Sequence, residues 1–268
     1  MGYLKRKAIF LQYQNISEDT DNFLDTWIYY KSFEEHLDYL SKNNVPIIPL
    51  DDAVAYLKRE FKLHKQSFSL TFDTGFVELY TLCFPLLKRY GFPATFFIRP
   101  DTVGKTEVIS ERQVKYMDWD QIRDLADSGM IIGLYGCKGR KLSSGSLKDV
   151  EEEIEESKLI FERELKRKII YYGVREGVPT KPMVKLFKRE GIRAVFCEAP
   201  TKQRTHHYAV GRIQIDDNDF NIILVKLSGI YVFFKDSRYW NYIRKYKIDK
   251  IAHWISHTIN RIRGKEVY

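Results

Sequence analysis

Short apolar runs alternate along the chain with longer segments in which apolar residues recur at helical spacing. The short runs are rich in β-branched and aromatic residues, and they predict strands at 7–13, 45–50, 67–72, 94–98, 130–134, 168–172 and 194–197, with late strands at 210–215 and 222–226. The periodic segments predict helices at 33–43, 51–61, 77–90, 118–128, 147–167 and 181–190.

The regular alternation of strand and helix indicates how the strands connect. A strand with its helix recurs roughly every 25 to 35 residues, which is typical of βαβ units in a parallel sheet. About seven such units predict an α/β fold whose sheet closes, or nearly closes, into a barrel. A doubly wound open sheet is the alternative, and the pattern alone does not exclude it. No GxGxxG or GxxxxGK[ST] motif is present, so a nucleotide site has no support.

Length and composition narrow the class of protein. The 268 residues suit one large α/β domain or two small ones, and no apolar run is long enough for a transmembrane helix. The apolar run at 8–11 is too short for the core of a signal peptide. Cys83, Cys137 and Cys197 are far apart and form neither a CxxC pair nor a disulfide framework. We therefore expect a reduced, cytoplasmic protein.

The positive charge of the chain is concentrated near its end. Residues 236–268 carry eight Lys or Arg and three Asp or Glu, a net charge of +5 out of +8 for the whole chain. Apolar residues in this segment approximate helical spacing, which predicts a basic amphipathic helix. We expect two units, a barrel at 1–235 and this tail at 236–268. The tail either packs on the barrel or docks on a membrane surface or a protein partner; a nucleic-acid partner is not expected.

One strand end carries a candidate catalytic group. The segment 69–75 reads SLTFDTG, so a predicted strand ends in Asp73 and a glycine turn follows. In a parallel barrel the active site lies at the carboxyl ends of the strands, so Asp73 would project into it. A strand-end acid also commonly caps the next helix, so Asp73 alone is weak support for an enzyme.

Two neighbouring segments resemble the polysaccharide deacetylase family, which is the NodB-homology domain of carbohydrate esterase family 4. SLTFDTGF at 69–76 and FPLLKRYGFPATFFI at 84–98 are similar to the family's TFDDG, PxLxxxG and PATFF motifs. Further similar segments lie at 13–16, 32–40, 117–122, 129–133 and 211–213. The resemblance runs over about residues 8–230 and implies a distorted (β/α) barrel of about seven strands.

The resemblance also implies a catalytic mechanism. This sequence carries the family's residue at only one of the positions that the mechanism requires. Family members remove acetyl groups from N-acetylated sugars with a divalent metal, usually zinc, that one Asp and two His hold, while a second Asp acts as general base. Asp73 matches the general base. Thr74 stands at the position of the metal-binding Asp, and Tyr135 and Gly139 stand at the two His positions. A neutral hydroxyl, a phenol and a glycine make no standard zinc site, so we expect neither a metal nor another cofactor.

The expected function follows from this partial match. We expect a protein that acts on or binds an N-acetylated glycan or a glycolipid precursor, without the standard zinc-dependent mechanism. Asp73 is the catalytic candidate, and Thr74, Tyr135, Lys138 and Arg175 are the candidate substrate-binding residues. Two alternatives stay open. One is an active hydrolase of amide bonds with altered catalytic residues, and the other is a non-catalytic subunit of a surface-polysaccharide assembly complex that docks through 236–268.

Overall fold

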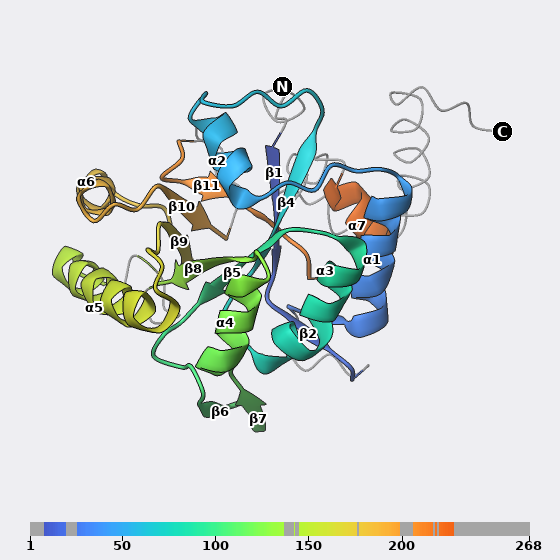
Figure 1. Cartoon of the computed structure of the whole chain (residues 1–268), viewed down its shortest axis with the longest axis horizontal. Coiled ribbons are helices and arrows are strands. Elements are labelled where there is room, and N and C mark those ends of the chain that lie inside the picture. The colour runs from blue at the N-terminus through green and yellow to red at the C-terminus, as the bar shows by residue number, and fades with distance from the viewer. Residues whose placement is uncertain are drawn as a thin grey trace, which may run out of the picture.

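In the computed structural model, eight strands form one sheet in which every pairing is parallel. The strands are β1 (Ala8–Tyr13), β4 (Ser67–Phe72), β5 (Ala94–Ile98), β8 (Ile131–Tyr135), β9 (Tyr171–Val174), β10 (Ala194–Cys197), β11 (Val210–Gly211) and β12 (Ile213–Gln214). Their order across the sheet is β11-β10-β9-β8-β5-β4-β1-β12 (Figure 1). The structure describes residues 8–19, 26–136, 142, 145–175, 177–198, 206–216, 218 and 220–227.

The two edges of this sheet meet in a single segment of chain. β11 pairs with β10 at one edge and β12 pairs with β1 at the other, and only Arg212 separates them. The Arg212 backbone N–H donates to the Cys197 carbonyl over 3.0 Å, and the Ile215 N–H donates to the Gln12 carbonyl over 2.8 Å. The eight strands are thus seven chain segments in a nearly closed ring. This confirms the predicted (β/α) barrel of about seven strands, and the open-sheet alternative is wrong.

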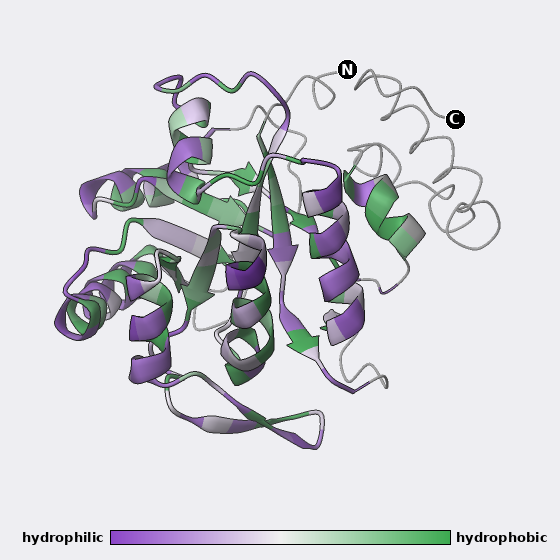
Figure 2. Cartoon of the chain, turned by 45° about the vertical axis from the view of Figure 1, so that its right-hand side comes forward, coloured by the Kyte–Doolittle hydropathy of each residue, from purple (hydrophilic) through white to green (hydrophobic). Residues whose placement is uncertain are grey.

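Helices surround the barrel, as predicted from the periodic segments. They are α1 (Tyr30–Lys42), α2 (Leu50–Leu57), α3 (Phe84–Tyr90), α4 (Trp119–Asp127), α5 (Leu147–Leu165), α6 (Lys181–Arg189) and α7 (Phe220–Leu227). Capping boxes at Asp118 and Ser146 satisfy the first backbone N–H groups of α4 and α5. Helices α1 to α6 turn apolar residues inward and polar residues outward, and Figure 2 shows green strands inside and purple on the outer helix faces.

The side chains inside the barrel form their own apolar cluster, and the helix α2 covers one end of it. Side chains from six strands meet in it, among them Phe10 of β1, Phe97 of β5 and Phe196 of β10. Leu50 and Val54 of α2 join the same cluster, so α2 covers the end of the barrel where the strands begin. Polar residues occupy the opposite end of the barrel, where the strands finish.

Phe97 fills the centre of the barrel because two neighbouring strands carry glycine beside it. A Cβ atom at Gly133 would lie 2.6 Å from the Phe97 ring, and one at Gly173 would lie 2.9 Å from it. Both distances are shorter than real Cβ contacts, so the ring and the two glycines are fitted to each other. The ring lies directly beneath the polar residues described below.

Two small pieces of sheet, which the sequence pattern did not predict, lie beside the carboxyl ends of the strands. β2 (Asn15–Ser17) pairs with β3 (Trp27–Tyr29), and β6 (Thr106–Ile109) forms a hairpin with β7 (Arg112–Lys115). The Met117 N–H after the hairpin donates to the Gly75 carbonyl over 2.9 Å. The segment that follows the hairpin is therefore hydrogen-bonded to the turn after Asp73, and Figure 1 shows the β6–β7 hairpin projecting from the body of the barrel.

Three predicted elements differ from the structure in type or regularity, while the strand predicted at 168–172 is shifted to 171–174 and the helix predicted at 51–61 ends at Leu57. The run at 222–226, predicted as a strand, lies in the helix α7. Residues 210–214 already occupy both edges of the sheet, so this apolar run packs against α1 instead. The predicted strand at 45–50 is only an isolated bridge from Ile47 to Phe68, because Pro46 and Pro49 have no N–H to donate. The predicted helix at 77–90 contains a π-helical turn, Leu79–Cys83, before α3.

The predicted tail helix and the domain boundary at 235 lie outside the described residues, which end at Leu227. Within the part of the chain that the structure describes, no helix is both long enough and apolar enough to cross a membrane.

The fit of Gly133 against Phe97 predicts a large effect for one added methyl group. We expect Gly133→Ala to lower the free energy of unfolding by about 1–3 kcal/mol, because the new Cβ has to displace a ring in the packed interior. Gly145→Ala is the matched control, since its Cβ would meet only Val150 at 3.6 Å. Urea unfolding of both variants measures the difference. Equal midpoints would contradict the packing described here.

His36 is a buried titratable group in the outer core. It lies on α1 between the rings of Tyr13 and Phe220, and neither ring nitrogen has a hydrogen-bond partner among the described residues. Burial, and after it the positive charge of Lys226, lowers the pKa of His36 to about 3. His36 is therefore neutral in the folded protein over the physiological pH range.

This lowered pKa predicts a loss of stability in mild acid. The unfolded chain binds a proton at His36 below about pH 6.5 and the folded chain does not, so unfolding becomes more favourable by about 1.4 kcal/mol per pH unit between about pH 6 and 3. Above about pH 6.5 the contribution is complete and constant. Urea unfolding at several pH values should show a steeper acid loss for the wild type than for His36→Phe. Parallel pH curves for the two proteins would refute this.

Candidate functional site

Polar side chains gather where the parallel strands end. Asp73 directly follows β4, Tyr135 is the last residue of β8, and Arg175 and Glu198 directly follow β9 and β10. Because parallel strands end at the same side of a barrel, these residues share its mouth. Tyr135 lies within electrostatic reach of all three others.

Asp73 is fully buried and forms a two-pronged ion pair with Arg212. Its Oδ1 atom lies 2.6 Å from one terminal guanidinium nitrogen, and its Oδ2 atom lies 2.8 Å from the other. The Gln12 amide donates a third hydrogen bond to Oδ2 over 2.7 Å. Both carboxylate oxygens therefore accept short, charge-assisted hydrogen bonds inside the protein.

Two further residues, Phe97 and Thr71, contact the Arg212 guanidinium. Its guanidinium carbon lies 5.2 Å from the centre of the Phe97 ring, and one of its terminal nitrogens is 3.3 Å from the Thr71 hydroxyl oxygen. Burial lowers the pKa of the Arg212 guanidinium, but the Asp73 carboxylate outweighs this and the pKa is raised overall. Both side chains are inaccessible to solvent.

Thr74 adopts a backbone conformation that is unusual for its residue type. Its φ is +75°, in the left-handed region that β-branched residues rarely occupy. Its hydroxyl donates to the carbonyl oxygen of Asp73 over 2.5 Å. The hydroxyl proton is thus used within the turn, and Thr74 is half-buried at the mouth.

Tyr135 is a buried, neutral phenol. Burial raises the pKa of Tyr135 well above its usual value, and the negative charges of Asp73 and Glu198 raise it further. The positive charges of Arg212 and Arg175 offset only part of this effect. The phenol is therefore a hydrogen-bond donor and not a phenolate at physiological pH.

A second carboxylate lies at the mouth, and a chain of hydrogen bonds holds it. The Thr26 hydroxyl donates to Gln14 Oε1 over 2.7 Å, and Gln14 Nε2 donates to Glu198 Oε1 over 3.2 Å. Glu198 is half-buried. The site thus contains two carboxylates: Asp73, which solvent does not reach, and Glu198, which is half-buried.

Comparison with known proteins gives the identity of this barrel. The family model for polysaccharide deacetylase matches residues 61–195, which is half of the chain. The chain belongs to the polysaccharide deacetylase family.

Individual relatives agree with this membership. The poly-β-1,6-N-acetyl-D-glucosamine N-deacetylase of Staphylococcus aureus is 22% identical over 256 residues, which cover 86% of each protein. Bacillus subtilis YxkH is 26% identical over 132 residues, so the match spans 49% of this chain and less than half of YxkH. Among solved structures, IcaB from Ammonifex degensii superposes with a TM-score of 0.67 at 23% identity, covering 78% of this chain and 91% of that one. The Streptococcus pyogenes deacetylase PplD gives 0.65 at 18% identity, with coverages of 78% and 92%. Both similarities support the deacetylase fold.

The described residues near Asp73 do not fit the divalent metal that the family implies. Thr74 offers only a neutral hydroxyl, which is a weak metal ligand, and Tyr135 is held as a neutral phenol, a poor zinc ligand. Lys138 and Gly139 lie outside the described residues, so their predicted positions are not tested.

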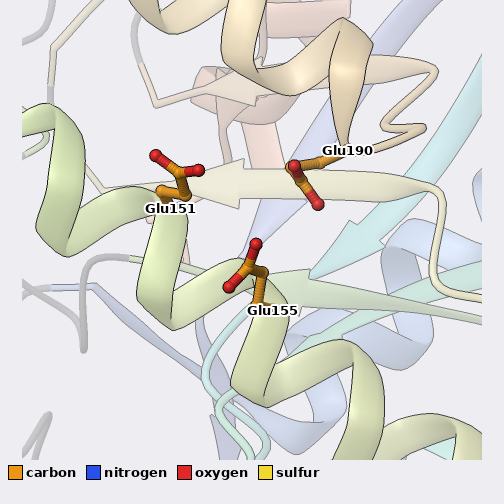
Figure 3. Close-up of side chains that lie close together, drawn as sticks. All are labelled: Glu151, Glu155 and Glu190. Carbon is orange, nitrogen blue, oxygen red and sulfur yellow. The ribbon is translucent and has the colours of Figure 1, made fainter.

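In the described part of the deacetylase chain, one group of three acids comes close enough together to be considered for a cation. Glu151 and Glu155 of α5 and Glu190 after α6 have carboxylate oxygens within 4.8 Å of one another (Figure 3). Arg189 pairs with Glu151 and Glu190, and Lys158 pairs with Glu190 over 3.2 Å. These two cations offset two of the three acids, so the group is largely a surface ion-pair network between two helices.

The structure therefore places the predicted Asp73, Thr74, Tyr135 and Arg175 at one mouth. It adds three residues to which the sequence analysis gave no role, Gln12, Arg212 and Glu198. Arg212 lay in a segment that matched the family, and Glu198 follows a predicted strand as Asp73 does, so a search of all strand ends for charged residues could have found both.

The buried pair predicts strong coupling between its two members. We expect Arg212→Met to lower the free energy of unfolding by about 3–5 kcal/mol, because it leaves the Asp73 carboxylate buried without a counter-charge. The double variant with Asp73→Asn should lose less than the sum of the single losses. Urea unfolding of the three proteins measures this coupling, and Lys42→Met at an exposed ion pair is the control expected to change nothing measurable. Additive effects would contradict the pairing.

Proposed function

We propose that this chain binds an N-acetylated glucosamine polymer at the barrel mouth and does not remove acetyl groups by the zinc-dependent route of its family. One observation carries the proposal: the carboxylate that matches the family's general base is fully buried, and Arg212 and Gln12 occupy both of its oxygens. To take a proton from water, Asp73 would first have to be uncovered, since its side chain is inaccessible to solvent.

The residues beside Asp73 support the same proposal. A metal-dependent hydrolase lowers the pKa of bound water to near neutrality, and this requires a metal site with about three protein ligands. Thr74 and Tyr135 offer a neutral hydroxyl and a neutral phenol in place of such ligands. Without an activated water, an amide bond in the site has no nucleophile of adequate strength.

The proposed ligand comes from the relatives and from the chemistry of the mouth. The staphylococcal relative, which aligns over most of this chain, is named for poly-β-1,6-N-acetyl-D-glucosamine. Sugar hydroxyl and amide groups are hydrogen-bond donors and acceptors, and the mouth offers the Tyr135 phenol, the exposed Arg175 and the Glu198 carboxylate. A neutral glycan matches this mixture of donors and acceptors, since neither sign of charge dominates it.

Zinc content and glycan binding of the purified full chain test the proposal together. After dialysis we expect well under one zinc per chain by mass spectrometry, because the described residues beside Asp73 provide no standard ligand set. Isothermal titration with a pentamer of β-1,6-linked N-acetylglucosamine should show binding, and a glucose oligomer of equal length should bind more weakly. Acetate release should stay at the level of a reaction without protein.

Two results would contradict the proposal in different ways. One zinc retained per chain, together with acetate release that a chelator abolishes, would show that the family's chemistry is intact. No binding of the pentamer would remove the glycan from the proposal and favour a role that does not involve this mouth.

A further inference from the structure

One exposed segment of the described chain combines positive charge with an exposed aromatic ring. The 58–66 segment joins α2 to β4 and carries four Lys or Arg and one Glu, a net charge of +3. Phe61 lies near its middle and is 43% exposed. Among the five large apolar side chains that are exposed in the described part of the chain, Phe61 is the only aromatic one. The segment thus presents an apolar ring and cations on the same surface.

The exposure of Phe61 follows from where α2 ends. The sequence pattern predicts a helix that continues to residue 61, which would place Phe61 on the buried face of that helix. The helix ends before this point, and the chain turns out of it at Arg59, whose φ is +66°. The Glu60 N–H donates to the Ala55 carbonyl over 2.8 Å, and Leu63 is buried in the apolar cluster inside the barrel. The chain is therefore held on both sides of the exposed ring.

Three cations of this segment have no counter-charge among the described residues. They are Arg59, Lys62 and Lys65, and all three are exposed. Lys58 pairs over 2.6 Å with Glu60, which is the one acid of the segment. An anion that approaches this surface therefore meets three cations that have no carboxylate to leave.

Basic residues from other parts of the chain extend this surface. Arg193 precedes β10 and His207 precedes β11, and both lie within electrostatic reach of Glu60. Lys188 of α6 and His206 lie within electrostatic reach of His207. The charges of Arg193 and Lys188 therefore continue the positive surface across the end of the barrel where the strands begin.

The 58–66 segment lies at the end of the barrel opposite the mouth. It leads into Ser67, the first residue of β4, whereas Asp73 follows the last residue of the same strand. In Figure 1 the segment between α2 and β4 runs across the top of the view, and the β6–β7 hairpin projects at the bottom. The segment also borders a hollow of about 430 Å³, lined by Tyr56, Arg59, Phe61, Lys62, Leu63 and His64.

We propose that the 58–66 segment docks the protein on an anionic phospholipid surface, with Phe61 inserted among the headgroups and its basic neighbours paired with lipid phosphates. Stable peripheral binding to a membrane takes two signals, and this segment carries an apolar one and an electrostatic one. A nucleic acid would use the same cations, but the apolar hollow beside them suits acyl chains better than a sugar-phosphate backbone. Docking at this end points the mouth away from the lipid, and this inference does not depend on the proposed function.

The helix α5 offers matched controls on a surface of opposite charge. Leu159 is 70% exposed there, so its apolar surface is as open to lipid as that of Phe61. The helix carries eight Asp or Glu and three Lys or Arg, a net charge of −5. An anionic surface repels such a helix, so changes on α5 should leave lipid binding as it is.

Co-sedimentation of the full chain with lipid vesicles tests the docking. We expect binding to vesicles of equal parts phosphatidylcholine and phosphatidylglycerol, weakening with added salt, and little binding to pure phosphatidylcholine. Phe61→Ser should lower the partition coefficient about tenfold and Lys62→Gln about fivefold. Leu159→Ser and Lys148→Gln on α5 should bind as the wild type does. Because all four side chains are exposed, urea unfolding should give midpoints close to that of the wild type.

A fluorescence measurement reports on insertion at the segment itself. Phe61→Trp should add emission that moves to shorter wavelength when the anionic vesicles are present, because the indole leaves water. The wild-type spectrum under the same conditions is subtracted to remove the native tryptophans. Leu159→Trp should show no such shift.

The inference has three ways to fail. The first is that the wild type does not bind the anionic vesicles. The second is that Phe61→Ser and Lys62→Gln bind them as the wild type does and Phe61→Trp shows no shift, which would place docking elsewhere, as in the predicted tail at 236–268. The third is that a single-stranded oligonucleotide binds more tightly than the vesicles and Lys62→Gln weakens both, which would assign the surface to a nucleic acid. The proposed function stands in each case, because Phe61→Ser should bind the N-acetylglucosamine pentamer as the wild type does.

Discussion

The ion pair between Asp73 and Arg212 connects the closure of the barrel to the chemistry of its mouth. Arg212 lies at the one residue where the last strand leaves β10 and joins β1, so its backbone completes the sheet while its side chain crosses the interior to β4. Burying two charges costs several kcal/mol each unless their geometry is good and their remaining atoms are bonded. Here the two-pronged contact, Gln12 and the ring of Phe97 supply good geometry, while the Nε atom of Arg212 is buried with no hydrogen-bond partner among the described residues.

The same pair limits what the site can do. A general base needs a carboxylate that is close to water and able to receive a proton, while a structural carboxylate needs to be dry and fully bonded. Asp73 in this chain is dry, and its two oxygens accept three hydrogen bonds. Nearer the surface, the half-buried Glu198 and the exposed Arg175 follow the neighbouring strands β10 and β9. The mouth thus has a dry inner layer and an outer layer that solvent reaches.

Most of the fold could be predicted from the sequence, because its strands are buried and its helices are amphipathic. The strands at 67–72, 94–98 and 194–197 match the structure in both type and bounds. The prediction was wrong where an apolar run is compatible with both a strand and a helix. The run at 222–226 is apolar enough for a strand, but residues 210–214 complete the sheet and the run is helical. The polar hairpin at 106–115 carries little periodicity, so its tertiary contacts and not its pattern define it.

The candidate site was predictable only in part. Asp73, Thr74, Tyr135 and Arg175 follow from strand ends and from the family resemblance, because both depend on position along the chain. The partners of Asp73 do not, because Gln12 and Arg212 are 61 and 139 residues away and neither spacing nor residue type predicts a contact across a barrel. The hydrogen bonds from Thr26 through Gln14 to Glu198 join three loops, and only the folded chain brings these together.

The backbone at Thr74 bears on the history of the site. Asp and Asn enter the left-handed region far more readily than a β-branched residue, since their short polar side chains bond locally and avoid the clash of a branched Cβ. Thr74 nonetheless has a φ of +75° there, at the position where the family motif TFDDG has its second Asp. The turn therefore has a shape that suits an aspartate or asparagine better than a threonine. The backbone hydrogen bond from Met117 to Gly75 helps to hold this shape, so the turn places a strained threonine beside the buried carboxylate.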